Sequence, residues 1–188
     1  MLPVVPLLPS GPLATDPLPS EPLRASPVLR TLHVVLVEPE IPPNTGNIAR
    51  LCAATRCPLH LVGRLGFRID EHAVRRAGLD YWPLVELHQH PDLGAAETWI
   101  ARSQGVTAAR TWLYSGKSRQ SYLAADYQPG DVLVFGKESV GLPAALLEGR
   151  ADRVLAIPTL GAVRSLNLSN AVAIGLYEAL RRIGALNV

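Results

Sequence analysis

Short apolar runs alternate with stretches of helical spacing along most of this chain. The apolar runs predict buried strands at 32–37, 59–63, 83–88, 111–114, 131–136 and 153–158. Apolar residues at helical spacing predict helices at 46–55, 92–103 and 143–149, and a closing helix with Val172, Leu176 and Leu180 on one face. Strands that alternate with helices predict an α/β fold, in which a mostly parallel sheet has helices on both faces.

The first 30 residues depart from this pattern because they are rich in proline. They hold eight of the 17 prolines: Pro3, Pro6, Pro9, Pro12, Pro17, Pro19, Pro22 and Pro27. Proline this dense blocks helix interiors and sheet ladders, so such segments are usually extended or disordered. We predict a dispensable tail over 1–30, or an over-long gene annotation, and one folded domain over 31–188.

Composition and charge limit the classes of protein to consider. The chain is 48% hydrophobic and 18% charged, and no apolar run approaches the ~20 residues that span a bilayer. A net charge of +2 gives no broad basic surface, so any nucleic-acid contact must come from local patches. Cys52 and Cys57 have no second pair, which argues against a zinc site or any other metal site and favours a reduced, cytoplasmic protein.

Three loops at strand ends are the best candidates for chemistry. In parallel α/β sheets, ligands bind outside the carboxyl ends of the strands. The first loop, "EPEIPPNTGNIAR", has Asn44 or Thr45 as a candidate helix cap and Arg50 further on. The second, "FGKESVGLP", places Gly136 and Glu138 directly after a strand.

The third loop, "IPTLGAVRSLNLSN", carries more polar side chains than its helix needs. Ser165, Asn167, Ser169 and Asn170 surround one helix start, although a helix needs a single N-cap. Three such loops favour a common site over three independent turns.

Common catalytic motifs are absent from the sequence. "SGKS" resembles the end of a phosphate-binding loop, but Thr111 stands where that motif needs glycine. We find no G-x-G-x-x-G after the first strand, no H-E-x-x-H and no G-x-S-x-G. The sequence therefore argues against an NTPase, an ordinary dinucleotide fold, a zinc protease and a serine hydrolase.

"NTGNIAR", "FGKESVGLP" and "IPTLGAVRSLNLSNAVAIGLYEALR" resemble the three motifs of the SpoU branch of the SPOUT methyltransferases. "VEPEIPPNTGNIARLCAAT" and "RRAGLDYW" resemble, more narrowly, the small tRNA methyltransferases that modify the ribose 2′-hydroxyl of the wobble cytidine or uridine. The resemblance extends from about Leu32 to Gly184. It implies a C-terminal deep trefoil knot, a homodimer and S-adenosyl-L-methionine as cofactor.

The resemblance also implies residue roles. The cofactor is expected to contact Tyr114, Gly136, Ile157, Ser165 and Leu166, in many cases through the backbone. Arg50 is expected nearest the ribose proton, with Asn44, Glu138 and Asn167 shaping the site. Because arginine normally stays protonated, a role for Arg50 as the base would need help from a substrate phosphate or from the dimer.

RNA contacts are expected from local cations outside the apparent strands: Arg75, Arg76, Lys117 and Arg119. Tyr81 and Trp82 are candidates for stacking on single-stranded bases. The homodimer is expected to use the closing helix, whose apolar stripe and Tyr177 exceed what a terminal helix usually buries. Two alternatives stay open: a catalytically silent RNA-binding protein, and a 2′-O-methyltransferase for another RNA site.

Overall fold

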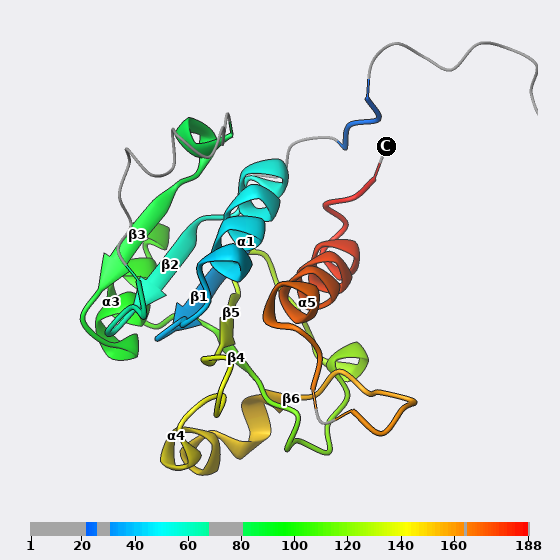
Figure 1. Cartoon of the computed structure of the whole chain (residues 1–188). Helices are drawn as coiled ribbons and strands as arrows, with labels where there is room; N and C mark the ends of the chain where they lie inside the picture. The colour runs from blue at the N-terminus through cyan, green and yellow to red at the C-terminus, as the bar shows by residue number, and fades with distance from the viewer. Residues whose placement is uncertain (1–21, 26–30, 68–80, 164, 188) are drawn as a thin grey trace, which may run out of the picture.

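Six strands and four α-helices alternate in the computed structural model, which describes residues 22–25, 31–67, 81–163 and 165–187 (Figure 1). The strands are β1 (His33–Val37), β2 (Leu59–Val62), β3 (Leu87–His90), β4 (Thr111–Tyr114), β5 (Val132–Phe135) and β6 (Val154–Leu155). The α-helices are α1 (Pro42–Thr55), α3 (Leu93–Gln104), α4 (Ala144–Gly149) and α5 (Leu168–Arg182). Three short 3-10 helices are Trp82–Leu84, Tyr122–Ala124 and Ala151–Arg153.

The strands form one parallel sheet in the order β3-β2-β1-β5-β4-β6. Tyr114 at the end of β4 lies opposite both Phe135 of β5 and Leu155 of β6. The carboxyl ends of these three strands therefore meet at one edge of the sheet. The predicted parallel α/β fold is confirmed.

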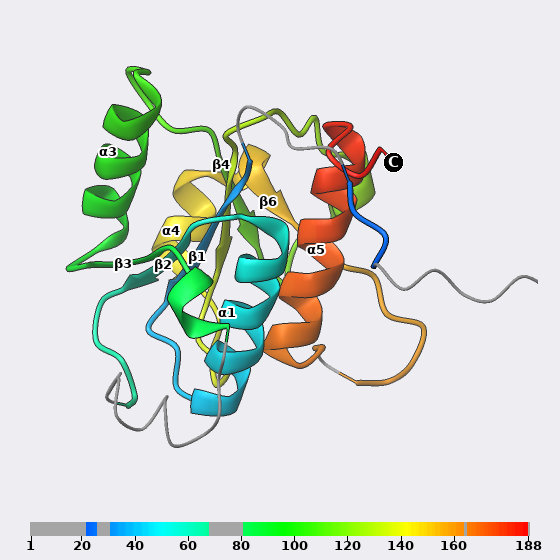
Figure 2. The same ribbon diagram turned by 90° about the horizontal axis from the view of Figure 1, so that it is seen from above.

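Helices cover both faces of this sheet, as predicted (Figure 2). On one face, α1 and α5 pack on a core that includes Leu36, Phe135 and Leu176. On the other face, α3 and α4 cover a core that includes Val35 and Val134. Both faces of β1, β2, β4, β5 and β6 are buried, which is why these strands appear in the sequence as apolar runs, whereas the edge strand β3 is only partly buried.

Three predicted elements have a boundary that differs from the structure by more than two residues. Helix α1 begins at Pro42, not at residue 46, and its N-cap is Ile41, whose carbonyl accepts from the amides of Asn44 and Thr45. The predicted cap at Asn44 or Thr45 is wrong because proline suits the first helical turn, where no amide donor is needed. The strand predicted at 83–88 begins only at Leu87, after a 3-10 turn. The strand predicted at 153–158 is limited to β6, with one further bridge at Ala156.

Histidines from three neighbouring strands form a chain of contacts on the α3 face. His33 Nδ1 lies 3.0 Å from His60 Nε2, and His60 Nδ1 lies 2.9 Å from His90 Nε2. The ring of Trp99 on α3 lies edge-on to that of His60 and close to that of His88. Burial lowers the pKa of His33 to about 4 and that of His60 to about 2, and also lowers the pKa of His90. Each contact in the chain can be made by neutral rings, since a neutral imidazole donates from one nitrogen and accepts at the other.

Several predictions fall outside what these residues test. Of the predicted tail, only 22–25 belongs to the described residues, where all four are exposed. The trefoil knot implied by the resemblance stays a prediction. Among the helices of the described ranges, none is long and apolar enough to cross a bilayer.

Candidate active site

A chain of hydrogen bonds joins the three strand-end loops. Asn44 Nδ2 donates to Glu138 Oε1 at 2.9 Å, and Asn167 Nδ2 donates to Asn44 Oδ1 at 3.0 Å. The three residues come from the start of α1, the loop after β5 and the start of α5. The structure thus brings together three of the four residues that were expected to shape the reaction.

The Glu138 carboxylate is held by donors on both oxygens. Glu40 N donates to Oε2 at 2.9 Å, and Ile41 N donates to Oε1 at 3.3 Å, beside the Asn44 amide. Burial by itself would raise the pKa of Glu138, but these hydrogen bonds outweigh it and lower the pKa below its ordinary value. Glu138 is therefore a fixed, ionised acceptor and a poor candidate for taking a proton.

Glu40 makes the reciprocal contact, which sequence reasoning missed. Its Oε2 accepts from Ser139 N at 3.0 Å and its Oε1 from Ser139 Oγ at 3.0 Å. Close by, Lys137 Nζ lies 2.8 Å from Glu38 Oε2, and this ion pair joins the same two loops. The second glutamate of "EPE" was the only signal in the sequence, and nothing in the sequence indicates its partner.

Asn167 accounts for part of the polar crowding before α5. Its Oδ1 accepts from the amides of Ser169 and Asn170 as the N-cap of the helix, and also from the Ser169 hydroxyl. Its side-chain Nδ2 donates to Asn44 Oδ1. One side chain therefore caps α5 and fixes the start of that helix to the start of α1.

The residues expected at the cofactor lie around the shared edge of β4, β5 and β6. Ile157 follows β6 and is half-buried against the core, and Leu166 is half-buried just before α5. Ser165 is exposed, as are residues 158–163 of the loop that precedes it. Two half-buried apolar side chains beside an exposed loop suit a ligand with an aromatic base and a polar tail, as S-adenosylmethionine has.

Gly136 and Tyr114 take part in this edge through their backbones. A Cβ at Gly136 would lie 2.2 Å from the carbonyl carbon of Gly141, so only glycine lets the chain fold back here. The Tyr114 ring is buried, stacks on Phe135 and bonds Tyr127 through its hydroxyl at 2.7 Å. Its side chain is committed to the core, which leaves its backbone for any cofactor contact.

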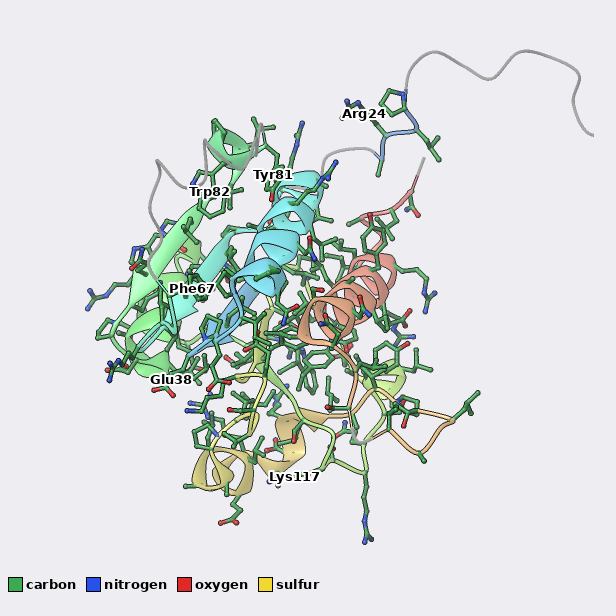
Figure 3. All side chains as sticks on the ribbon, in the orientation of Figure 1. Arg24, Glu38, Phe67, Tyr81, Trp82 and Lys117 are labelled. Atoms are coloured by element: carbon green, nitrogen blue, oxygen red, sulfur yellow. The ribbon has the colours of Figure 1, made fainter. Side chains whose placement is uncertain are left out.

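Arg50 lies apart from this network. Its side chain is exposed, and its guanidinium carbon lies 5.6 Å from the centre of the Tyr81 ring. The Tyr81 hydroxyl donates to the carbonyl of Gly46 at 3.1 Å, which ties this ring to α1 (Figure 3). Arg50 lies six positions after Asn44 in the helix, which places the two roughly 120° apart around α1 and ~9 Å apart along it.

Two of the four cations expected at the RNA can be placed. Lys117 (Figure 3) and Arg119 are exposed on the loop after β4. This loop runs beside β6, since Ala156 N donates to Gln120 O. They flank the edge that carries the expected cofactor residues. Arg75 and Arg76 lie outside the described residues. Within those residues, no group of three or more His, Cys, Asp or Glu could hold a metal ion.

Known proteins resemble this chain over most of its length. The profile of the SpoU rRNA Methylase family matches residues 31–177. A tRNA (cytidine(34)-2′-O)-methyltransferase from Photorhabdus asymbiotica is 45% identical over 157 residues, which cover 81% of this chain and 94% of that protein. A structure concerning 2-OH methylation of C/U34 on tRNA superposes with a TM-score of 0.72 and 44% identity, over 81% of this chain and 96% of the other. The SpoU methyltransferase AviRb from Streptomyces viridochromogenes, in complex with AdoMet, gives a TM-score of 0.68 and 26% identity over 86% and 62%.

Proposed function

Since this chain belongs to the SpoU rRNA methylase family, we propose that it is a tRNA ribose 2′-O-methyltransferase acting on cytidine or uridine at wobble position 34. The observation that carries the proposal is the 45% identity to a tRNA (cytidine(34)-2′-O)-methyltransferase across nearly that protein's whole length. The hydrogen-bond chain from Glu138 through Asn44 to Asn167 supports it, because it joins all three motifs in one site.

The reaction moves a methyl group to a ribose oxygen. S-adenosylmethionine supplies an electrophilic methyl on a sulfonium. The S–CH3 bond breaks, the O–CH3 bond forms, and the proton of the 2′-hydroxyl leaves. The protein's part is to align the oxygen with the methyl group and to assist loss of that proton.

The cofactor is assigned to the edge formed by Tyr114, Gly136, Ile157, Ser165 and Leu166. The half-buried side chains of Ile157 and Leu166 suit the base, and Ser165 beside them is exposed. Asn167 follows this loop directly and is bonded to Asn44. The hydrogen-bond chain therefore connects the cofactor loop to the motif that holds Arg50.

Arg50 is assigned to the 2′-oxygen of the substrate. An arginine side chain keeps its charge at neutral pH, so it stabilises negative charge that develops on the oxygen as the proton leaves. Its exposure on α1 leaves it accessible to RNA. Direct removal of the proton by Arg50 would require help from a substrate phosphate or from a second copy of the chain.

The proposal includes a homodimer that forms partly through α5. Ile174 and Tyr177 on this helix are 38% and 48% exposed. Burial of these side chains against a second copy would remove apolar surface from water, and dimerisation would double the cations available to tRNA. A cytoplasmic location is also part of the proposal, in keeping with the two free, buried cysteines, Cys52 and Cys57.

The decisive experiment is transfer of a radiolabelled methyl group from S-adenosylmethionine to tRNA that lacks wobble methylation. We expect incorporation, with mass mapping of nuclease fragments placing the methyl group on the ribose of nucleotide 34. The Asn44→Ala variant is the control for dependence on the site. Binding of tRNA without incorporation would favour the silent RNA-binding protein, and a methyl group elsewhere would favour a different RNA site.

A further inference from the structure

We infer that Glu40 is a positioning residue for methyl transfer: by holding Ser139, it keeps the Glu138 carboxylate in place against Asn44. Glu40 lies in the first loop and Ser139 in the second. This inference rests on the proposed function, because it deepens the account of that same site.

The contacts form a two-way clasp between neighbouring residues. The backbone amide of Glu40 donates to Glu138, while the side chain of Glu40 accepts from the amide and hydroxyl of Ser139. Each loop thus supplies backbone donors to a carboxylate of the other: Glu40 N and Ile41 N donate to Glu138, and Ser139 N donates to Glu40. Hydrogen bonds to a carboxylate are shorter and stronger than those between neutral groups.

The clasp lies directly beside the groups that build the site. Glu138 Oε1 is the acceptor for Asn44, and Asn44 is in turn the acceptor for Asn167 at the start of α5. Displacement of the second loop would move Glu138 and release the Asn44 amide. Small displacements of positioning groups lower turnover strongly, since the reacting atoms must be aligned.

The neighbouring Glu38–Lys137 pair provides a matched control. It joins the same two loops through a carboxylate, but among the described contacts it touches neither Asn44 nor Glu138. The test therefore compares Glu40→Ala with Glu38→Ala, so that each variant loses one glutamate and one link between the loops. Ser139→Ala tests the other side of the clasp, since it removes the hydroxyl and keeps the amide.

Methyl transfer to tRNA is measured with kcat and both KM values, together with the melting temperature and calorimetric affinity for S-adenosylmethionine. We expect Glu40→Ala to lower kcat about tenfold, with both KM values and the cofactor affinity within about twofold. Ser139→Ala should give a smaller loss, and Glu38→Ala should stay within about twofold of the parent. In a Glu138→Ala background, Glu40→Ala should change kcat by less than about twofold, because Glu40 acts through Glu138.

Titration of the Glu138 carboxyl by carbon NMR gives a readout that does not depend on activity. If Glu40 holds Glu138 in place, Glu40→Ala should loosen the hydrogen bonds from Asn44 and from the amides of residues 40 and 41, which lower the pKa of Glu138. The pKa of Glu138 should then rise by more than the loss of the neighbouring negative charge lowers it, whereas Glu38→Ala should not raise it. An unchanged kcat in Glu40→Ala would overturn the inference. So would an equal loss of kcat on adding Glu40→Ala to the parent and to the Glu138→Ala variant. A joint fall in melting temperature and cofactor affinity would make Glu40 merely structural. If the parent protein transfers no methyl to tRNA, the proposed function fails, and the titration still decides whether Glu40 holds Glu138.

Discussion

Acidification should destabilise this protein through the chain His33–His60–His90. The pKa of His33 is lowered to about 4 and that of His60 to about 2, mainly by burial, whereas both rings take up a proton near 6.5 when unfolded. The unfolded state therefore binds more protons than the folded state between these values. Stability that is fully present above about pH 6.5 is lost as the pH falls below it.

The size of the effect follows from the two rings that are almost fully buried, His33 and His60, which are 8% and 0% exposed. At pH 5, uptake of a proton near 6.5 favours the unfolded state by about 2 kcal/mol for each ring that stays neutral when folded. Two such rings give about 4 kcal/mol, a large part of the 5–15 kcal/mol that stabilises a typical domain. The half-exposed His90 is left out of this sum.

Urea unfolding at pH 7.5 and 5.0, followed by circular dichroism, measures the effect. The His60→Gln variant has only one of the two buried rings. Between pH 7.5 and 5.0, its free energy of unfolding should therefore fall by about 2 kcal/mol less than the free energy of unfolding of the parent falls. The contributions of the other titrating groups cancel in this difference, because the parent and the variant share those groups. His88→Gln is the control, because the His88 ring stacks on His60 but pairs with the Glu86 carboxylate at 3.0 Å and, among the described contacts, hydrogen-bonds no other imidazole. An equal pH dependence in the parent and His60→Gln would refute the reasoning.

Arg50→Ala should abolish methylation and spare cofactor affinity, because Arg50 lies outside the cofactor edge; calorimetry showing that cofactor binding is abolished would place it there instead. The double variant Lys117→Ala/Arg119→Ala should raise the KM for tRNA and flatten the slope of log affinity against log salt by roughly 0.7 to 0.9 for each phosphate that the protein no longer binds. An unchanged slope would move the RNA surface elsewhere. Asp131→Ala should lower the free energy of unfolding by about 3 kcal/mol, since its buried carboxylate accepts from Arg110 at 2.8 Å and from the buried Trp112 ring, whose N–H would lose its acceptor. Urea unfolding checks this, and a loss under about 1 kcal/mol would contradict it.

Local pattern was enough for the parallel α/β class and most of its elements, and insufficient for the strand order and for the site's internal contacts. The run at 111–114 predicted β4 to the residue, because a buried strand must be apolar on both faces. The start of α1 was placed too late, because asparagine is a common helix cap and Asn44 was taken for one. In the structure the Asn44 side chain instead donates to Glu138, a partner that the sequence does not reveal. The bonds that define the site join residues far apart in the chain, and periodicity carries no information on such pairs.

The histidine chain illustrates the same limit. A search for short metal-binding spacings leaves His33, His60 and His90 unconnected, because they lie on three different strands. Only the register of the parallel sheet places them together: Val35 lies opposite His60, and Val62 opposite His90. Once the strand order is known, each contact follows from the two-residue period of side chains along a strand.

The central position of β1 also sets the order in which a growing chain can fold on the ribosome. Strands β1, β2 and β3 follow one another early, with α1 between the first two, so this part of the sheet can assemble as soon as it is made. The other edge of β1 has to wait for β5, which pairs Val35 with Val134. Until then a hydrophobic strand edge stays open to other chains, and such non-local pairings form slowly. Synthesis of the middle third of this protein is therefore the interval in which a nascent chain is most exposed to aggregation and most in need of a chaperone.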